Sequence, residues 1–125
     1  MEAAGRILVV DDNHAVRSTV SRMLSHLGYE VSSADSGESA LGIFHKDQFD
    51  IVISDYEMPG MDGVAFASSI KSFSPCTRIV IMTGAGREAV LSRKGAAVDE
   101  VLSKPFTMNE INETIRNVAG MELGA

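Results

Sequence analysis

Residues 50–63 read DIVISDYEMPGMDG, an apolar run that ends at an acid and opens into a loop. Residues 51–54 consist almost entirely of Ile and Val, which is typical of a strand buried on both faces of a parallel sheet. Asp55 follows this run directly, and Asp62-Gly63 predicts the start of a helix. The stretch therefore predicts a strand, a polar loop and a helix, which is the repeating unit of an α/β protein.

Strand-like runs recur on both sides of this stretch, and polar residues follow most of them. Residues 7–10 precede two acids, residues 78–82 precede a threonine, and residues 101–103 precede a lysine. A weaker strand is expected at residues 29–34. Apolar residues at helical spacing and capping signals predict helices between the strands and after the last one. These helices are expected at about residues 14–27, from 36 onward, 63–74, 87–94 and from 108 onward.

This alternation predicts an α/β fold, a doubly wound parallel sheet of five strands with five helices, of the flavodoxin-like type. The common strand order for such a sheet is 2-1-3-4-5, in which strands 1, 3, 4 and 5 are consecutive neighbours. Because neighbouring strands lie ~4.8 Å apart, the polar residues at their carboxyl ends are expected to share one edge. These residues are Asp11, Asp12, Asp55, Thr83 and Lys104.

Composition limits the classes of function. The 125 residues suit one domain spanning 1–125, with an ordered core expected at about 5–119. A net charge of −6 argues against direct nucleic-acid binding and against an anionic membrane surface as partner. Cys76 is the single cysteine, so no internal disulfide is possible, and a reduced, cytoplasmic setting is expected. No apolar run approaches the ~20 residues that span a bilayer.

The clustered acids predict a metal-dependent phosphoryl-transfer site. Three carboxylates at one edge repel one another, and a hard divalent cation such as Mg²⁺ or Mn²⁺ would let them stay ionised. The Lys104 ammonium suits a phosphoryl group, and the Thr83 hydroxyl can donate to a phosphoryl oxygen. Asp55, central among these residues, is the expected nucleophile, because carboxylates form aspartyl-phosphates.

Four motifs make the chain resemble the receiver domain of two-component response regulators, including the chemotaxis regulators, over nearly its whole length. The motifs are ILVVDD at 7–12, DIVISDYEMPGMDG at 50–63, MTG at 82–84 and KPF at 104–106. The resemblance implies that Asp55 accepts a phosphoryl group from a histidine kinase or a histidine phosphotransfer protein. It also implies that phosphorylation alters binding to a downstream effector or output domain, which the sequence does not name.

The resemblance also assigns roles to the neighbouring residues. It implies that Asp11, Asp12, Asp55 and the backbone carbonyl of Glu57 arrange Mg²⁺. It further implies that Thr83 moves to bond the phosphoryl group, that Lys104 pairs with it, and that the bond before Pro105 is cis.

The chain departs from the family pattern near the fourth helix. Val101 stands where family members often carry a Tyr or Phe that swings inward when the threonine moves. Residues 97–100 replace a common Gly-Ala-Asp-Asp pattern, and the segment from Thr83 to Lys104 is about one residue shorter than usual. Glu57 and Ala85 occupy the positions that flank the path of the hydrolytic water in the family. Their side chains lead to the hypothesis of slow self-dephosphorylation.

The predicted function is a phosphorylation-dependent signalling switch, and not a turnover enzyme. The alternative is a degenerate receiver that acts only as a docking module, and the change at Val101 keeps this alternative open. A haloacid-dehalogenase-like phosphatase is disfavoured, because Glu57 stands where that class carries a second Asp. A dinucleotide-binding loop at 84–89 is disfavoured, because no acid at a following strand end could take the ribose.

Overall fold

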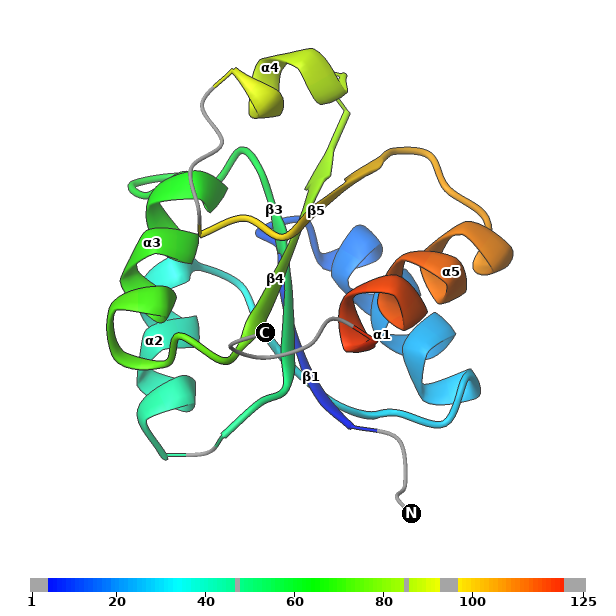
Figure 1. Ribbon diagram of the computed structural model, residues 1–125, viewed down its shortest axis with the longest axis horizontal. Coiled ribbons are helices and arrows are strands. Elements are labelled where there is room, and N and C mark those ends of the chain that lie inside the picture. The colour runs from blue at the N-terminus through cyan, green and yellow to red at the C-terminus, as the bar shows by residue number, and fades with distance from the viewer. Residues whose placement is uncertain (1–4, 47, 85, 93–96, 121–125) are drawn as a thin grey trace.

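The computed structural model describes residues 5–46, 48–84, 86–92 and 97–120. Its centre is a parallel sheet with the order β2-β1-β3-β4-β5, as the sequence predicts (Figure 1). The strands are β1 (Arg6–Val10), β2 (Glu30–Ala34), β3 (Ile51–Asp55), β4 (Arg78–Thr83) and β5 (Glu100–Ser103).

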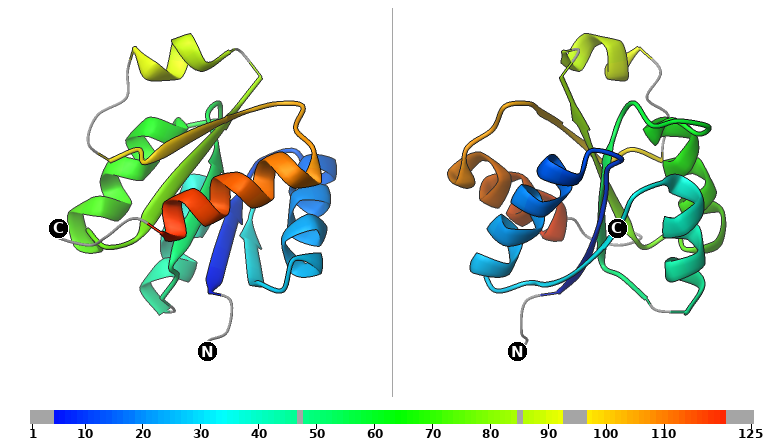
Figure 2. Two further views of the ribbon diagram at one scale, coloured as in Figure 1. Left: turned by 45° about the vertical axis from the view of Figure 1, so that its right-hand side comes forward. Right: turned by 180° about the vertical axis from the view of Figure 1, so that it is seen from behind.

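The expected five helices surround this sheet. They are α1 (His14–His26), α2 (Gly37–Lys46), α3 (Gly63–Phe73), α4 (Arg87–Leu91) and α5 (Met108–Ala119). In Figure 1, α1 and α5 cover one face of the sheet, and α2 and α3 cover the other. In both views of Figure 2, α4 lies beyond the end of the sheet, apart from the two helix layers.

Side-chain caps fix the starts of four helices. In α2, Ser36 accepts the Ser39 N–H at 3.0 Å. Asn13 accepts the Val16 N–H at 3.0 Å at the start of α1. Asp62 caps α3 in the same way, by accepting the Ala65 N–H at 2.9 Å. Thr107 opens α5 with the predicted capping box. Each cap satisfies backbone donors that a helix leaves unpaired in its first turn, so these local signals confirm the predicted starts.

The alternating side chains of β1 show why its sequence is continuously apolar. Ile7 and Val9 pack into the core on the α1 and α5 side, and Leu8 and Val10 pack into the core on the α2 and α3 side. All four side chains are fully buried. A strand covered on both faces has no solvent-facing positions, so every residue in it can be apolar.

The structure differs from the predicted boundaries at the strand ends. Asp55 and Thr83 are the last residues of β3 and β4 rather than the first residues of loops, because strand pairing continues through them. Some expectations concern residues outside the described ranges. These are the position of Ala85, the end of the fourth helix at Lys94 and the tail at 121–125. Within the described part of the chain, none of the helices is long enough and apolar enough to cross a membrane.

Candidate functional site

The three predicted acids meet at the carboxyl end of the sheet. Asp11 and Asp12 follow β1 directly, and Asp55 ends the neighbouring strand β3. Each offers a carboxylate oxygen, and these oxygens lie within 4.8 Å of one another. They line an open pocket of about 790 Å³. The other residues lining it are Asn13, Val16, Glu57, Met58, Pro59, Asp62 and Lys104.

Lys104 reaches this cluster from the end of β5. Its Nζ lies 2.9 Å from Asp55 Oδ1 and 3.4 Å from Asp11 Oδ2. Its backbone N–H donates to the Thr83 carbonyl at 2.8 Å, which joins the ends of β4 and β5. The peptide bond between Lys104 and Pro105 is cis, the isomer that the family resemblance implied. The sheet thus brings together groups that are 49 and 93 residues apart in the chain.

Thr83 and Glu57 lie at the edges of this arrangement. Thr83 ends β4 one position beyond Met82, the register partner of Asp55, and its side chain is buried. Glu57 lines the pocket and is exposed. Thr83 is predicted to contact a phosphoryl group, and Glu57 is predicted to direct its backbone carbonyl toward the metal. The placement of both residues is consistent with these roles, which stay predictions.

Burial and charge oppose each other at Asp55. Burial raises the pKa of its carboxyl above the ordinary value, and the negative charge of Asp11 adds to that rise. The hydrogen bond and charge of Lys104 lower the pKa but do not cancel the rise. For Lys104, burial is the largest single influence and lowers its pKa, yet the combined hydrogen bonds and charges of Asp55 and Asp11 outweigh burial and raise it. The ionised form of Asp55 is therefore under-stabilised by the protein's own groups.

This imbalance fits a bound divalent cation. Three carboxylates and one ammonium leave two negative charges in the cluster, and a divalent ion would balance them. Carboxylate oxygens are the ligands that Mg²⁺ and Mn²⁺ prefer. Asp11, Asp12 and Asp55 therefore fit the metal that the sequence predicts.

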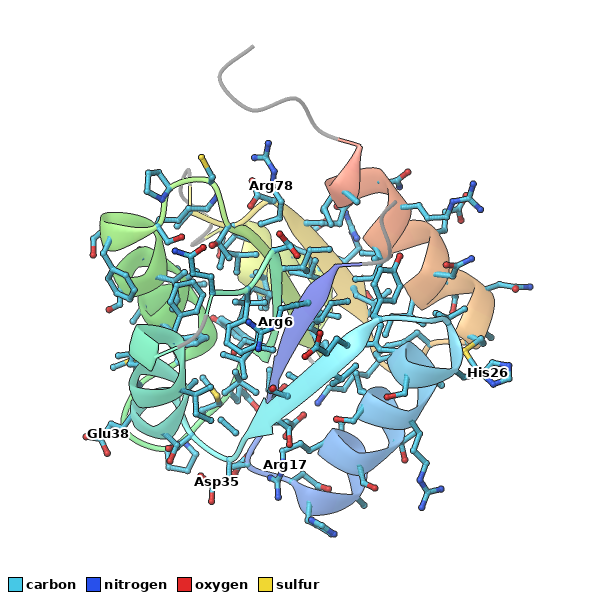
Figure 3. The ribbon with its side chains drawn as sticks, turned by 90° about the horizontal axis from the view of Figure 1, so that it is seen from below. Arg6, Arg17, His26, Asp35, Glu38 and Arg78 are labelled. Carbon is cyan, nitrogen blue, oxygen red and sulfur yellow. The ribbon has the colours of Figure 1, made fainter. Side chains whose placement is uncertain are left out.

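Two contacts that the sequence analysis missed hold Asp11 in place. The Asn13 N–H donates to Asp11 Oδ1 at 2.9 Å, so Asn13 serves both Asp11 and the start of α1. Arg17, from α1, donates through Nη1 to the Asp11 backbone carbonyl at 2.7 Å. In Figure 3, Arg17 lies at the end of the molecule near Asp35, opposite Arg78 at the start of β4. Arg17 follows the strand-end acid Asp11 by six residues, and this spacing is the sequence signal that could have indicated the contact.

A glycine shapes the loop that follows Asp55. A Cβ on Gly63 would lie 2.5 Å from the Asp55 backbone oxygen and 3.1 Å from the Tyr56 Cα. The Gly63 N–H also donates to the Tyr56 carbonyl at 2.8 Å. Residues 56–62 therefore form a closed loop that returns to the strand end, and only glycine permits this approach.

Val101 is buried and packs in the core cluster that also contains Val90 and Val98. Its side chain fills this space without a ring that could change orientation.

Comparisons with known proteins agree with this geometry. The sequence profile described as response regulator receiver domain matches residues 7–116. A probable chemotaxis protein CheY of Rhizobium etli is 33% identical, with 92% of each chain covered. The autoinducer 1 sensor kinase/phosphatase LuxN of Vibrio campbellii is 33% identical over 89% of this chain, which spans 13% of LuxN. The structure of the response regulator TrrA from Thermotoga maritima in complex with Mg²⁺-BeF superposes with a TM-score of 0.83. It is 34% identical and covers 90% of this chain and 97% of TrrA.

Proposed function

We propose that this chain, which belongs to the family of response regulator receiver domains, is a signalling switch whose phosphoryl acceptor is Asp55. Members of this family are phosphorylation-dependent switches of two-component systems and are not turnover enzymes. They receive phosphoryl groups from histidine kinases and act on effectors. The observation that carries the proposal is the convergence of three carboxylates with Lys104, whose Nζ lies 2.9 Å from Asp55 Oδ1.

The transfer would be a single displacement at phosphorus. A carboxylate oxygen of Asp55 forms the new O–P bond, and the P–N bond of a phosphohistidine donor breaks. The imidazole nitrogen leaves with the bonding electron pair. Lys104 holds Asp55 Oδ1 and would pair with a phosphoryl oxygen after transfer, and the Thr83 hydroxyl would donate to another. Such a reaction depends on positioning and charge neutralisation, not on a dedicated base.

The metal site supports this chemistry. Asp11, Asp12, Asp55 and the backbone carbonyl of Glu57 would hold Mg²⁺ or Mn²⁺. A bound divalent ion would supply positive charge for the phosphoryl oxygens and for the crowded carboxylates.

The donor would be a histidine kinase or a histidine phosphotransfer protein, and the output would be altered binding to an effector or output domain. We expect these exchanges in the cytoplasm, where Cys76 stays reduced. The chain spans 13% of the length of LuxN, so it corresponds to one part of that protein. The activity and partners of any longer protein that contains this chain are therefore also proposals.

The experiment that tests the proposal is mass spectrometry after incubation with acetyl phosphate and Mg²⁺. The wild type should gain about 80 Da, the mass of one phosphoryl group, on Asp55. Asp55→Asn should lose the adduct, and Asp35→Asn, which changes an exposed acid after β2, should keep it. A wild type that never gains the adduct would favour the docking-only alternative.

We also expect slow self-dephosphorylation. Glu57 would place negative charge beside the phosphoryl group, and Ala85, outside the described residues, has no polar group that could orient a water molecule. The decay of radiolabelled phospho-protein measures the lifetime. The wild type should outlast Glu57→Ala, and decay of the wild type within seconds would contradict the expectation.

A further inference from the structure

Helix α4 is attached to the rest of the molecule by an apolar contact and by a polar one. This helix has five residues and begins at Arg87. Val90 anchors it through a fully buried side chain in the core. The second anchor is polar: Arg87 Nη1 donates to the backbone carbonyl of Val101 in β5 at 2.6 Å. A charged donor makes this bond stronger than one between neutral groups.

The carbonyl that accepts this hydrogen bond belongs to a residue at which the chain departs from the family pattern. Val101 is the residue where the family resemblance implies an aromatic switch, and its buried valine side chain has no ring to reorient. In this chain, therefore, the backbone of residue 101 contacts α4 through Arg87.

The same bond is linked to the phosphorylation site through a short segment. Only three residues separate Thr83 from Arg87. The Thr83 carbonyl accepts the Lys104 N–H at 2.8 Å, just after β5, and Arg87 donates to Val101 within β5. Gly86, with φ of 98°, supplies a backbone conformation that other residues rarely adopt. A shift of Thr83 toward Asp55 would therefore change the separation between these two points of attachment.

We propose that Arg87 is the positioning residue that couples the state of Asp55 to α4, through its hydrogen bond to the Val101 carbonyl. The inference rests on the proposed function. In the unphosphorylated protein the bond holds α4 against β5. When Thr83 moves to a phosphoryl group, Arg87 leaves Val101 and the start of α4 is released to present a different surface to a partner. The exposed position of Arg87 allows this release, whereas the buried Val90 keeps α4 attached.

Hydrogen exchange of the α4 amides, followed by mass spectrometry, tests the inference. In the wild type, phosphorylation by acetyl phosphate and Mg²⁺ should accelerate exchange in α4. Arg87→Ala should show the accelerated exchange, about tenfold, without phosphorylation, as expected for the loss of one hydrogen bond from a charged donor. Arg87→Lys, which keeps a donor, should exchange more slowly than Arg87→Ala. The matched control is Arg22→Ala, which removes an exposed arginine from α1 and should exchange like the wild type.

A second measurement uses the reciprocity of coupled equilibria. If phosphorylation breaks the Arg87 bond, then loss of the bond must favour the phosphorylated-like state. Beryllium fluoride with Mg²⁺, the ligand type in the TrrA structure, should therefore bind Arg87→Ala more tightly than the wild type or Arg22→Ala.

The outcomes separate the two proposals. A wild type that gains no phosphoryl adduct overturns both the proposed function and the coupling. A wild type that gains the adduct, with α4 exchange in unphosphorylated Arg87→Ala equal to that of the unphosphorylated wild type, overturns only the role of Arg87. Equal beryllium fluoride affinities for Arg87→Ala and Arg22→Ala would also overturn it.

Discussion

At the scale of one residue, the buried and charged position of Asp55 lowers the stability of the metal-free protein. Its side chain is 12% exposed and lies beside the charge of Asp11, and burial raises its pKa even though Lys104 is 2.9 Å away. A raised pKa means that the folded state binds the proton more tightly than the unfolded state does. Ionisation of Asp55 therefore lowers the free energy of unfolding when no cation is present.

This sign gives a prediction for pH. The cost of ionising Asp55 is absent below the ordinary carboxyl pKa of 3.8 and is complete once the pH has risen through the raised pKa. Asp55→Asn cannot ionise, so its stability relative to the wild type should increase from about pH 4 to pH 7 in EDTA. Urea unfolding of both proteins across this range measures the difference. A gap that stays constant or narrows would show that Lys104 fully compensates the charge.

Two glycines show how the same substitution acts differently in two helices. Gly63 begins α3, and an added Cβ would meet the Asp55 backbone oxygen at 2.5 Å. Gly42 lies inside α2, where an added Cβ has no neighbour within 4 Å. Helix propensity favours alanine over glycine by about 1 kcal/mol in a helix interior, such as position 42, and less at the first residue of a helix, such as position 63. The contacts of the loop after Asp55 should reverse this preference at Gly63 alone.

Gly42→Ala should therefore raise the free energy of unfolding by about 1 kcal/mol. Gly63→Ala should lower it by about 1–3 kcal/mol, the range for forcing an extra group into a packed site, and should also weaken phosphorylation of Asp55. Urea unfolding gives the stabilities, and labelling by acetyl phosphate gives the second effect. If Gly63→Ala is as stable as Gly42→Ala, the close approach to Asp55 does not constrain the loop.

Asp99 joins three elements at the opposite end of the sheet from the phosphorylation site. Its carboxylate lies 3.0 Å from Lys71 Nζ in α3 and 3.7 Å from Arg78 Nη1 in β4. It also accepts the Ile79 N–H at 2.8 Å. Asp99 belongs to residues 97–100, which depart from the family pattern. In the structure these contacts fix Asp99 at the entry of β5.

Removal of this carboxylate should be costly. Asp99→Ala should lower the free energy of unfolding by about 2–3 kcal/mol, because a partly buried acceptor of charged donors is lost. The matched control is Glu30→Ala, which removes a 72% exposed side chain that lies 3.6 Å from Arg6 and should cost less than about 0.5 kcal/mol. Urea unfolding compares the two variants. Equal losses would mean that Asp99 contributes no more than a surface ion pair.

The whole molecule couples its stability to the metal site. The folded sheet alone brings Asp11, Asp12 and Asp55 together, so a cation that balances them binds the folded state in preference to the unfolded chain. Mg²⁺ at 100 times its dissociation constant should add about 2.7 kcal/mol of stability, a rise of roughly 10 °C in Tm for a chain of this size.

Calorimetry with and without Mg²⁺ measures this effect. Asp12→Asn removes an exposed member of the cluster and should reduce the rise in Tm, whereas Asp35→Asn should keep it. A wild-type Tm that does not respond to Mg²⁺, or an equal rise in Asp12→Asn, would count against the metal assignment.

Local sequence patterns by themselves predict many of the strands and helix starts of this protein. The apolar runs at 7–10 and 51–54 predicted strands buried on both faces, because a strand with no solvent face needs no polar residues. Asn13, Asp62 and Thr107 predicted helix starts, because a cap depends only on residues within one turn. The strand order then followed from general rules of chain crossing, and it placed Asp11, Asp55 and Lys104 at one edge.

The tertiary structure decided the contacts between these elements. The bond from Arg17 to the Asp11 carbonyl, the bond from Arg87 to Val101 and the closeness of Gly63 to Asp55 depend on how helices sit against strand ends. Sequence periodicity fixes which face of an element is apolar. It does not fix the register of β5 or the distance from α4 to the sheet, because those follow from packing among residues far apart in the chain.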